Sequence, residues 1–320
     1  MSKMNMVQAI NLALREEMER DDRVLILGED VGRDGGVFRT TEGLLEKFGP
    51  ERVIDTPLSE SVIAGAGIGM AAYGLRPVVE IQFMGFIYPA VDQIFSHASR
   101  IRSRSRGRFT CPMVVRTPYG AGIRAPELHS ESTEAIFCHM PGLKVVVPSG
   151  PYNAKGLLIS SIRDPDPVVF LESTRLYRLF KEEVPEGEYI VPLGKARVVR
   201  EGNDLTVIAW GSMLHRSLEA ASEFDADVID LMTLSPYDEE TVLQSVKKTG
   251  RAVIVHEAPK TSGFGAEIAA SLAEDAILYL KAPVIRVGGY DAVMPMPKLE
   301  DYYIPGVERI RKAFNEVMKY

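Results

Sequence analysis

Hydrophobic residues recur along the chain with two periods, one typical of amphipathic helices and one of buried strands. A four-residue spacing predicts a helix over residues 5–20, with Met6, Ile10, Leu14 and Met18 on one face. Short apolar runs follow, and such runs are typical of strands that a parallel sheet buries on both faces. The predicted strands cover residues 23–28, 52–54, 78–83, 113–116, 145–147 and 168–171. A helix predicted over residues 153–162 separates the last two strands, so the alternation favours an α/β fold.

The second part of the chain repeats this alternation after an interruption. Residues 182–188 are charged and contain proline and glycine, which is typical of a linker. Beyond it, two strands flank Gly202-Asn203 and predict a β-hairpin. Those hairpin strands cover 195–200 and 205–210, and further strands cover 227–231, 251–256 and 283–287, with a helix near 239–247. We therefore expect two α/β domains, residues 1–186 and 187–320.

Composition narrows the classes of function. The chain has 320 residues, 46% hydrophobic and 25% charged, with a formal net charge of −7. An acidic balance disfavours nucleic acids and anionic membranes as main partners, and no apolar run approaches membrane-spanning length. Arginine occupies every second position over residues 100–108, but without interleaved aromatic residues, so a subunit contact is the preferred interpretation there. Two cysteines and no secretory pattern lead us to expect a cytoplasmic protein.

A glycine-rich helix follows the turn Asp55-Thr56-Pro57. Ser59 is a candidate N-cap and Glu60 the first helical residue. Gly65 and Gly69 share one face, which predicts close approach of another backbone or helix. Glu60 has two interpretations: a carboxylate that the helix dipole favours, or a catalytic carboxyl group that holds or shares a proton near neutral pH. The glycine spacing is not a dinucleotide fingerprint, because Met70 stands where the third glycine is required.

Two other positions carry candidate chemistry. Phe86 lies just past the predicted strand 78–83, and ligands of α/β sheets bind beyond the carboxyl ends of strands. Core packing is the alternative for that side chain. His129 lies in a loop after the strand 113–116, flanked by acidic and hydroxyl residues. It is either a structural loop residue or a proton donor that works near neutral pH.

Several motifs resemble one family. "DTPLSE" before the glycine-rich helix, "EIQFMGFIYPAVDQI" around Phe86, and "HS" before "PGLKVV" are similar to beta chains of the first component of 2-oxo acid dehydrogenases, which use thiamine diphosphate. "LTVIAWG", "VIDLMTLSP" and "VIVHEAP" resemble the transketolase C-terminal domain. The resemblance therefore implies a pyrimidine-binding transketolase-like domain followed by a transketolase C-terminal-like domain.

The resemblance also assigns roles to single residues. Glu60 is expected to hydrogen-bond a ring nitrogen of the cofactor's aminopyrimidine, favouring the imino tautomer that removes the thiazolium proton. Phe86 is expected to stack on that ring, with Leu58 and Gln82 also in the cofactor pocket. His129 is expected near the thiazolium, where it assists reductive acylation of a lipoyl group.

A potassium site is implied at the turn of residues 161–167, where two prolines free carbonyl groups from ladder pairing. The ligands carried over by resemblance are Met113, Ser161, Ile162, Asp164 and Asp166. Many relatives have Asn at the position of Asp166, which matters little if a main-chain oxygen is the ligand. An ordinary capped turn is the alternative.

The resemblance also implies partners. Nowhere does the chain carry a Gly-Asp-Gly element followed by an Asn pair, with which the family holds magnesium and the diphosphate. We therefore expect an alpha subunit to supply magnesium and half of the cofactor site in an α2β2 heterotetramer, with a lipoyl-bearing acyltransferase as the second partner. The rival hypotheses are a self-sufficient transketolase-like enzyme and a noncatalytic subunit that retains the fold.

Substrate identity depends on weaker motifs. "EIQF", "AWG" and "HEAP" favour a branched-chain 2-oxo acid, whereas "PELHS" and "GLLISSIRDPDPV" also resemble pyruvate enzymes. We place the branched-chain substrate first, with pyruvate as the alternative.

Overall fold

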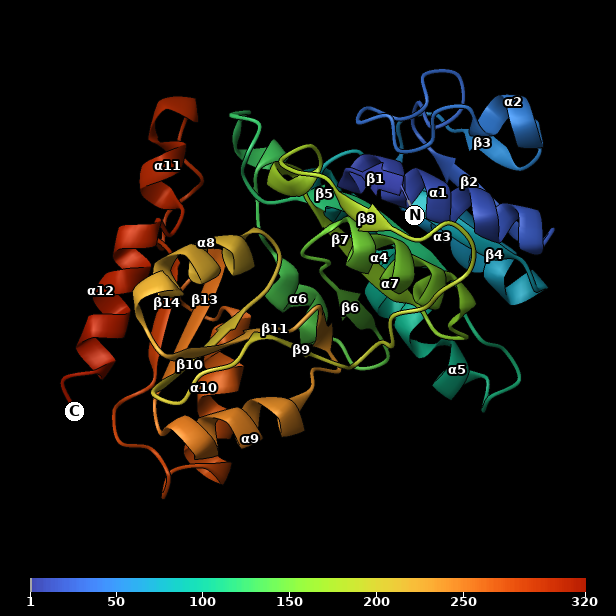
Figure 1. Cartoon of the computed structure of the whole chain (residues 1–320). Coiled ribbons are helices and arrows are strands. Elements are labelled where there is room, and N and C mark those ends of the chain that lie inside the picture. The colour runs from blue at the N-terminus through green and yellow to red at the C-terminus, as the bar shows by residue number, and fades with distance from the viewer. Residues whose placement is uncertain (1) are drawn as a thin grey trace.

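The computed structural model describes residues 2–320 and consists of two α/β halves packed side by side (Figure 1). The first half is built on a seven-stranded sheet in which every neighbouring pair is parallel except β12–β6. Its order is β12 (Thr233–Ser235), β6 (Lys144–Val146), β7 (Val168–Ser173), β5 (Val114–Tyr119), β4 (Arg76–Glu80), β2 (Val24–Gly28) and β3 (Val53–Asp55). The predicted parallel strands are confirmed, although β4 ends three residues earlier than expected.

Helices cover both faces of this sheet because its strands are apolar on both sides. Val24 and Ile26 pack with α1 (Met6–Arg20) and α7 (Pro151–Arg163), while Leu25 and Leu27 pack with α3 (Glu60–Tyr73) and α4 (Val91–Ser96). The helix predicted from the four-residue spacing is confirmed, and Asn5 caps it in a reciprocal box with Gln8. The remaining elements of this half are α2 (Leu44–Phe48), α5 (Ile101–Arg104), α6 (Glu134–Cys138) and the antiparallel pair β1 (Ser2–Met4) and β8 (Glu182–Val184).

The second half has a five-stranded sheet ordered β14 (Ile285–Gly289), β13 (Ala252–Pro259), β10 (Leu205–Ala209), β11 (Ala226–Asp230) and β9 (Arg197–Arg200). Its helices are α8 (Ser212–Ala220), α9 (Glu239–Thr249), α10 (Phe264–Asp275), α11 (Glu300–Tyr303) and α12 (Val307–Val317). The short 3-10 helices of the whole chain are η1 (Met84–Phe86), η2 (Tyr88–Ala90), η3 (Ala98–Arg100), η4 (Glu127–His129), η5 (Thr174–Leu176), η6 (Ala221–Glu223) and η7 (Pro297–Leu299). Within residues 2–320 the structure has no helix with the length and apolar character needed to cross a bilayer.

The predicted hairpin is wrong. β9 pairs antiparallel with β11, and β10 lies between β11 and β13. Every residue of β10 is buried, so this strand needs a neighbour on both edges and helices on both faces, whereas Arg197 and Val198 on β9 are exposed and suit a sheet edge. The sequence also left β12 undetected: it comes from the second part of the chain but pairs with β6 of the first sheet.

Buried carboxyl groups join the two halves. Trp210 Nε1 donates to Glu134 Oε1 over 3.2 Å, and Ser149 Oγ donates to Asp230 Oδ1 over 2.7 Å. Burial raises the pKa of Glu134 and of Asp230 to about 7 in each case. Each hydrogen bond crosses from one half to the other and favours the ionised acid, but burial outweighs it, so the folded chain is most stable when these acids are protonated.

The raised pKa of Asp230 predicts a pH dependence of the free energy of unfolding that an Asp230→Asn variant lacks. Below about pH 3.8 the group is protonated whether the chain is folded or unfolded, and as pH rises toward 7 only the folded chain keeps the proton. The wild-type free energy of unfolding should therefore fall by roughly 2–3 kcal/mol between about pH 5 and pH 7 through this group. Urea unfolding of both proteins across that range measures the difference, from which the shared contribution of Glu134 cancels. Parallel pH curves for the two proteins would contradict the prediction.

Candidate active site

The candidate site lies where four neighbouring parallel strands end at one edge of the large sheet. Strands β3, β2, β4 and β5 are adjacent, and their carboxyl ends point the same way. The segments that follow them carry Glu60 after β3, Glu29 after β2, Phe86 after β4 and His129 after β5. Parallel pairing therefore gathers at one edge residues that are up to a hundred positions apart in the sequence.

Glu60 is the first residue of α3, with Ser59 at the N-cap position as predicted. The Ser59 side chain makes no capping hydrogen bond. Glu60 is half-buried and close enough to Glu29 for the two charges to interact. The pKa of Glu29 is raised first by the burial of Glu29 itself and then by the charges of Glu60 and Asp30. Glu29 is not among the site residues predicted from the sequence, although its position directly after a buried strand was an available signal.

The glycines of α3 act differently from the expectation. A Cβ on Gly67 would lie 2.7 Å from Met113 Sδ and 3.0 Å from Val79 Cγ1, so this glycine lets the helix approach the sheet. A Cβ on Gly65 would make an ordinary contact with Gln93, and none of the described atoms lies within 4 Å of that position on Gly69. Within this chain the close approach is therefore made at Gly67, and the close approach expected on the face of Gly65 and Gly69 stays a prediction.

Aromatic rings surround His129. Its ring centroid is 4.2 Å from that of Phe83 and 5.1 Å from that of Phe86, and Phe83 and Phe86 meet edge to face at 5.6 Å. The two segments touch because Gly85 has no side chain: a Cβ there would lie 2.6 Å from the main-chain oxygen of Leu128. The structure thus brings together two of the predicted site residues, Phe86 and His129, on η1 and η4.

One atom of this cluster is left without a partner. Nδ1 of His129 is buried and makes no hydrogen bond to any described residue. A buried, unpaired ring nitrogen is costly unless a ligand or water satisfies it. Half-buried aromatic faces, an unpaired imidazole nitrogen and a half-buried carboxyl group suit a flat, polar heteroaromatic cofactor.

The other two predicted cofactor residues are placed less deeply. Gln82 Nε2 donates to Asp30 Oδ2 over 2.8 Å, so Gln82 links the segments after β4 and β2 at the site edge. The Leu58 side chain is 78% exposed, so within this chain it contacts little. The assignment of Leu58 to the cofactor pocket stays a prediction, and it requires a cofactor or a second polypeptide that covers this side chain.

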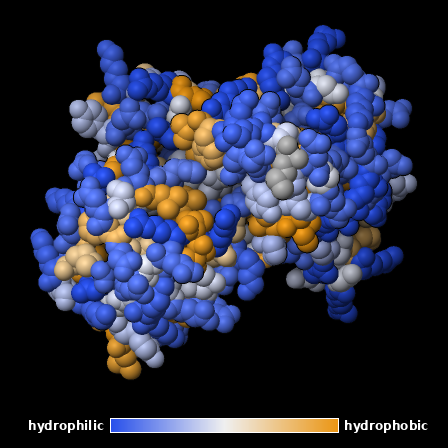
Figure 2. Space-filling view, in the orientation of Figure 1, coloured by the Kyte–Doolittle hydropathy of each residue, from blue (hydrophilic) through white to orange (hydrophobic). Residues whose placement is uncertain are grey.

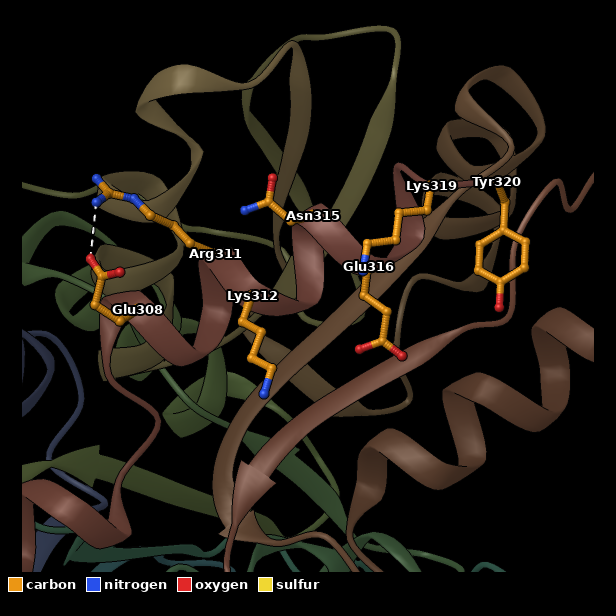
Figure 3. Close-up of a pocket in the computed structure, with 7 residues that line it drawn as sticks. All are labelled: Glu308, Arg311, Lys312, Asn315, Glu316, Lys319 and Tyr320. Atoms are coloured by element: carbon orange, nitrogen blue, oxygen red, sulfur yellow. Dashed lines mark hydrogen bonds and ion pairs between the residues drawn. The ribbon is translucent and has the colours of Figure 1, made fainter.

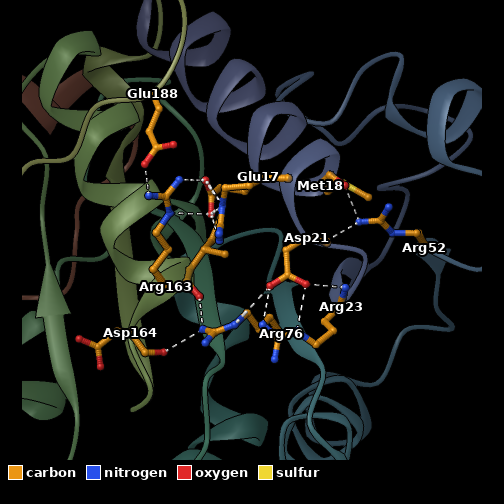
Figure 4. Close-up of polar contacts among 11 residues, drawn as sticks. Glu17, Met18, Asp21, Arg23, Arg52, Arg76, Arg163, Asp164 and Glu188 are labelled. Atoms are coloured by element: carbon orange, nitrogen blue, oxygen red, sulfur yellow. Dashed lines mark hydrogen bonds and ion pairs between the residues drawn. The ribbon is translucent and has the colours of Figure 1, made fainter.

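The turn assigned to potassium already holds cations. Arg76 reaches the end of α7, where its Nη1 donates to the main-chain oxygens of Ile162 over 2.8 Å and Asp164 over 3.4 Å (Figure 4). The Met113 oxygen accepts from the Val168 amide over 3.0 Å. A guanidinium on two of the candidate oxygens repels a further cation, so these main-chain groups do not fit an open potassium site.

The side chains of the same turn are paired as well. Asp164 binds Lys144 Nζ over 2.6 Å, Asp166 binds Arg102 over 2.6 Å, and Ser161 donates to the Leu157 carbonyl. Within the described part of the chain, no group of three or more His, Cys, Asp or Glu side chains is arranged to hold a metal ion. No step below depends on potassium.

A surface hollow of about 610 Å³ lies elsewhere, on the outer face of α12 (Figure 3). Charged side chains line it, including Arg311, which pairs with Glu308 across one end. It lacks an apolar wall for a heteroaromatic ring, so its size does not make it the cofactor site.

Comparison with known proteins places the chain in a family. The sequence model of the transketolase pyrimidine-binding domain matches residues 2–179, and that of the transketolase C-terminal domain matches residues 194–310. Pyruvate dehydrogenase E1 component subunit beta of Staphylococcus epidermidis is 53% identical, and that of Bacillus subtilis 50% identical, each over 325 aligned positions covering 100% of both chains. The chain belongs to the beta-subunit family of the thiamine-diphosphate-dependent first components of 2-oxo acid dehydrogenases.

A solved structure supports the fold independently. A split-gene transketolase described as an inactive beta4 tetramer superposes with a TM-score of 0.81 over 99% of each chain, at 21% identity. The expected transketolase-type architecture of two α/β domains is confirmed. The exact boundary at residues 186 and 187 lies between the two matched regions and stays a prediction.

Proposed function

We propose that this chain is the beta subunit of a pyruvate dehydrogenase first component, which decarboxylates pyruvate oxidatively and acylates a lipoyl group. The observation that carries the activity is the gathering of Glu60, Phe86 and His129 at one sheet edge, with a buried imidazole nitrogen left unpaired. The substrate assignment rests on the full-length relatives, since both are named for pyruvate. They favour the pyruvate alternative over the branched-chain substrate that we placed first from the sequence.

Different residues of this chain would serve different steps of the reaction. Thiamine diphosphate, when bound, supplies the nucleophilic carbon and the electron sink for loss of carbon dioxide. Glu60 would hold a proton at the aminopyrimidine ring nitrogen, and Phe86 would stack on that ring and exclude water from it. His129 would deliver a proton to the lipoyl sulfur that leaves as the dithiolane opens.

A second polypeptide completes the proposal. Several large apolar side chains are exposed in the single chain, among them Leu278 at 94% and Tyr73 at 88%, and apolar patches show on the face drawn in Figure 2. Exposed apolar area of this kind is typical of surfaces that a partner covers. We infer an alpha subunit in an α2β2 heterotetramer, which holds magnesium and the diphosphate, and a lipoyl acyltransferase that receives the acyl group. A cytoplasmic location remains a prediction. Potassium at the turn of residues 161–167 also remains untested, and it would first have to displace Arg76 from the Ile162 and Asp164 oxygens.

Reconstitution tests the proposal. We expect the isolated chain neither to bind thiamine diphosphate with magnesium at micromolar concentration nor to decarboxylate 2-oxo acids. With its alpha subunit, it should show a higher kcat/KM for pyruvate than for any of three branched-chain 2-oxo acids. Calorimetry on the isolated chain and steady-state kinetics on the pair measure both. Tight cofactor binding by the chain alone would refute the shared site, and preference for a branched-chain acid would restore the first substrate assignment.

A further inference from the structure

The loop that carries His129 is held at its base by the second half of the molecule. Residues 120–131 connect β5 to the segment before α6, and the Gly120 amide donates to the Glu131 oxygen over 2.8 Å, which closes the loop at its neck. We propose that two buried carboxylates of the C-terminal half, Glu257 and Glu300, are positioning residues that set the place of His129 through this loop. The inference rests on the proposed role of His129.

Glu257 holds the first residues of the loop. It lies on β13, is 3% exposed, and accepts hydrogen bonds from the Ala121 amide over 2.5 Å and from Ser212 Oγ over 2.8 Å. Gly120 has φ +76, and a Cβ there would lie 2.8 Å from Glu257 Oε1. Both the left-handed backbone and the nearby carboxylate therefore require glycine at that position.

Glu300 holds the next bend. It is the first residue of α11 and is 2% exposed; its Oε2 accepts from the Arg124 amide over 3.1 Å and its Oε1 from Arg175 Nη2 over 3.4 Å. Gly122 has φ +141, and a Cβ there would lie 2.7 Å from the Arg175 main chain. The loop thus packs closely on the Arg175 main chain at Gly122 and is tied to Glu300 at Arg124.

These contacts act on His129 through a short piece of chain. Only four residues lie between Arg124 and His129, and the far limb is fixed by the contact between Gly85 and Leu128. A loop fixed at both limbs places its tip with little freedom, and a displacement of about 1 Å in a reacting group can cost on the order of 10²-fold in rate. The C-terminal half therefore contributes to catalysis without touching substrate or cofactor.

The test uses the enzyme reconstituted with its alpha subunit. Glu300→Ala should lower kcat for lipoyl acylation by about 10–100-fold with KM for the lipoyl domain unchanged, while decarboxylation coupled to an artificial electron acceptor stays close to wild type. Asp301→Ala is the matched control, because Asp301 is 58% exposed and pairs only with the Arg124 and Arg175 side chains. Equal effects of the two variants would overturn the proposal.

A double variant separates positioning from a general structural role. If Glu300 acts through His129, Glu300→Ala should cause no further loss of acylation in a His129→Ala background. Losses that multiply would contradict the proposal. Hydrogen exchange of the amides in residues 120–131 should be faster in the Glu300→Ala single variant than in the wild type. It should also be faster in Glu300→Gln, but by less, because that side chain keeps an acceptor oxygen. Unchanged exchange would refute the contact. If His129→Ala alone slows both half-reactions equally, the proposed role of His129 fails, whereas the exchange result still decides the positioning contact.

Discussion

Glu60→Gln is expected to lower turnover of the assembled enzyme by about 10²–10⁴-fold, the usual contribution of a positioned acid–base group. The amide keeps the shape and half-buried position of Glu60 at the start of α3 but cannot exchange a proton with the aminopyrimidine ring. Every step that needs the activated cofactor should slow, including decarboxylation coupled to an artificial electron acceptor. Steady-state kinetics of the reconstituted pair, with pyruvate as substrate, give the measurement.

A matched control distinguishes this role from the helix-dipole interpretation. Glu46 is also a first-turn carboxylate, on α2, and it is exposed. A dipole contribution alone is worth about 0.3–1 kcal/mol of stability and little in rate. Glu46→Gln should therefore leave turnover unchanged. Near-wild-type turnover of Glu60→Gln would remove this residue from the catalytic machinery.

His129→Ala should separate the two half-reactions that Glu60→Gln slows together. The imidazole is proposed to protonate the lipoyl sulfur, so its loss should reduce acyl transfer to the lipoyl domain by about 10²–10⁴-fold. Decarboxylation coupled to an artificial acceptor needs no such proton and should be affected far less. Both half-reactions and the melting temperature are measured on one preparation.

The alternative for His129 makes a different set of predictions. Its ring packs against Phe83 and Phe86, so a purely structural residue would, on truncation, lower the melting temperature and slow both half-reactions equally. His139→Ala, at an exposed histidine just after α6, serves as the control and should change neither assay. A His129→Ala enzyme active in both half-reactions would exclude His129 from the site.

The local patterns of the sequence determined most of the elements and their class. Apolar runs such as residues 24–28 can only be buried on both faces, so they demand a parallel sheet between layers of helices. The four-residue spacing in residues 6–18 and the N-terminal position of Glu60 in α3 likewise depend on neighbours in sequence. The "DTPLSE" and "HS" motifs indicated the family from the sequence alone, because each is a short and continuous run of residues.

The tertiary structure alone decided how these pieces meet. Strand order placed the segments of Glu29, Glu60, Phe86 and His129 at one edge, and it paired β9 with β11 where the sequence suggested a hairpin. Glycine is required at positions 85 and 120 because a Cβ there would clash with Leu128 and Glu257 respectively, and these two residues lie far away in the sequence. Hydrogen bonds such as that from the Arg124 amide to Glu300 span 176 residues. No pattern of neighbouring residues encodes such pairs, because their energy arises from distance in space and from burial, which exist only once the chain has folded.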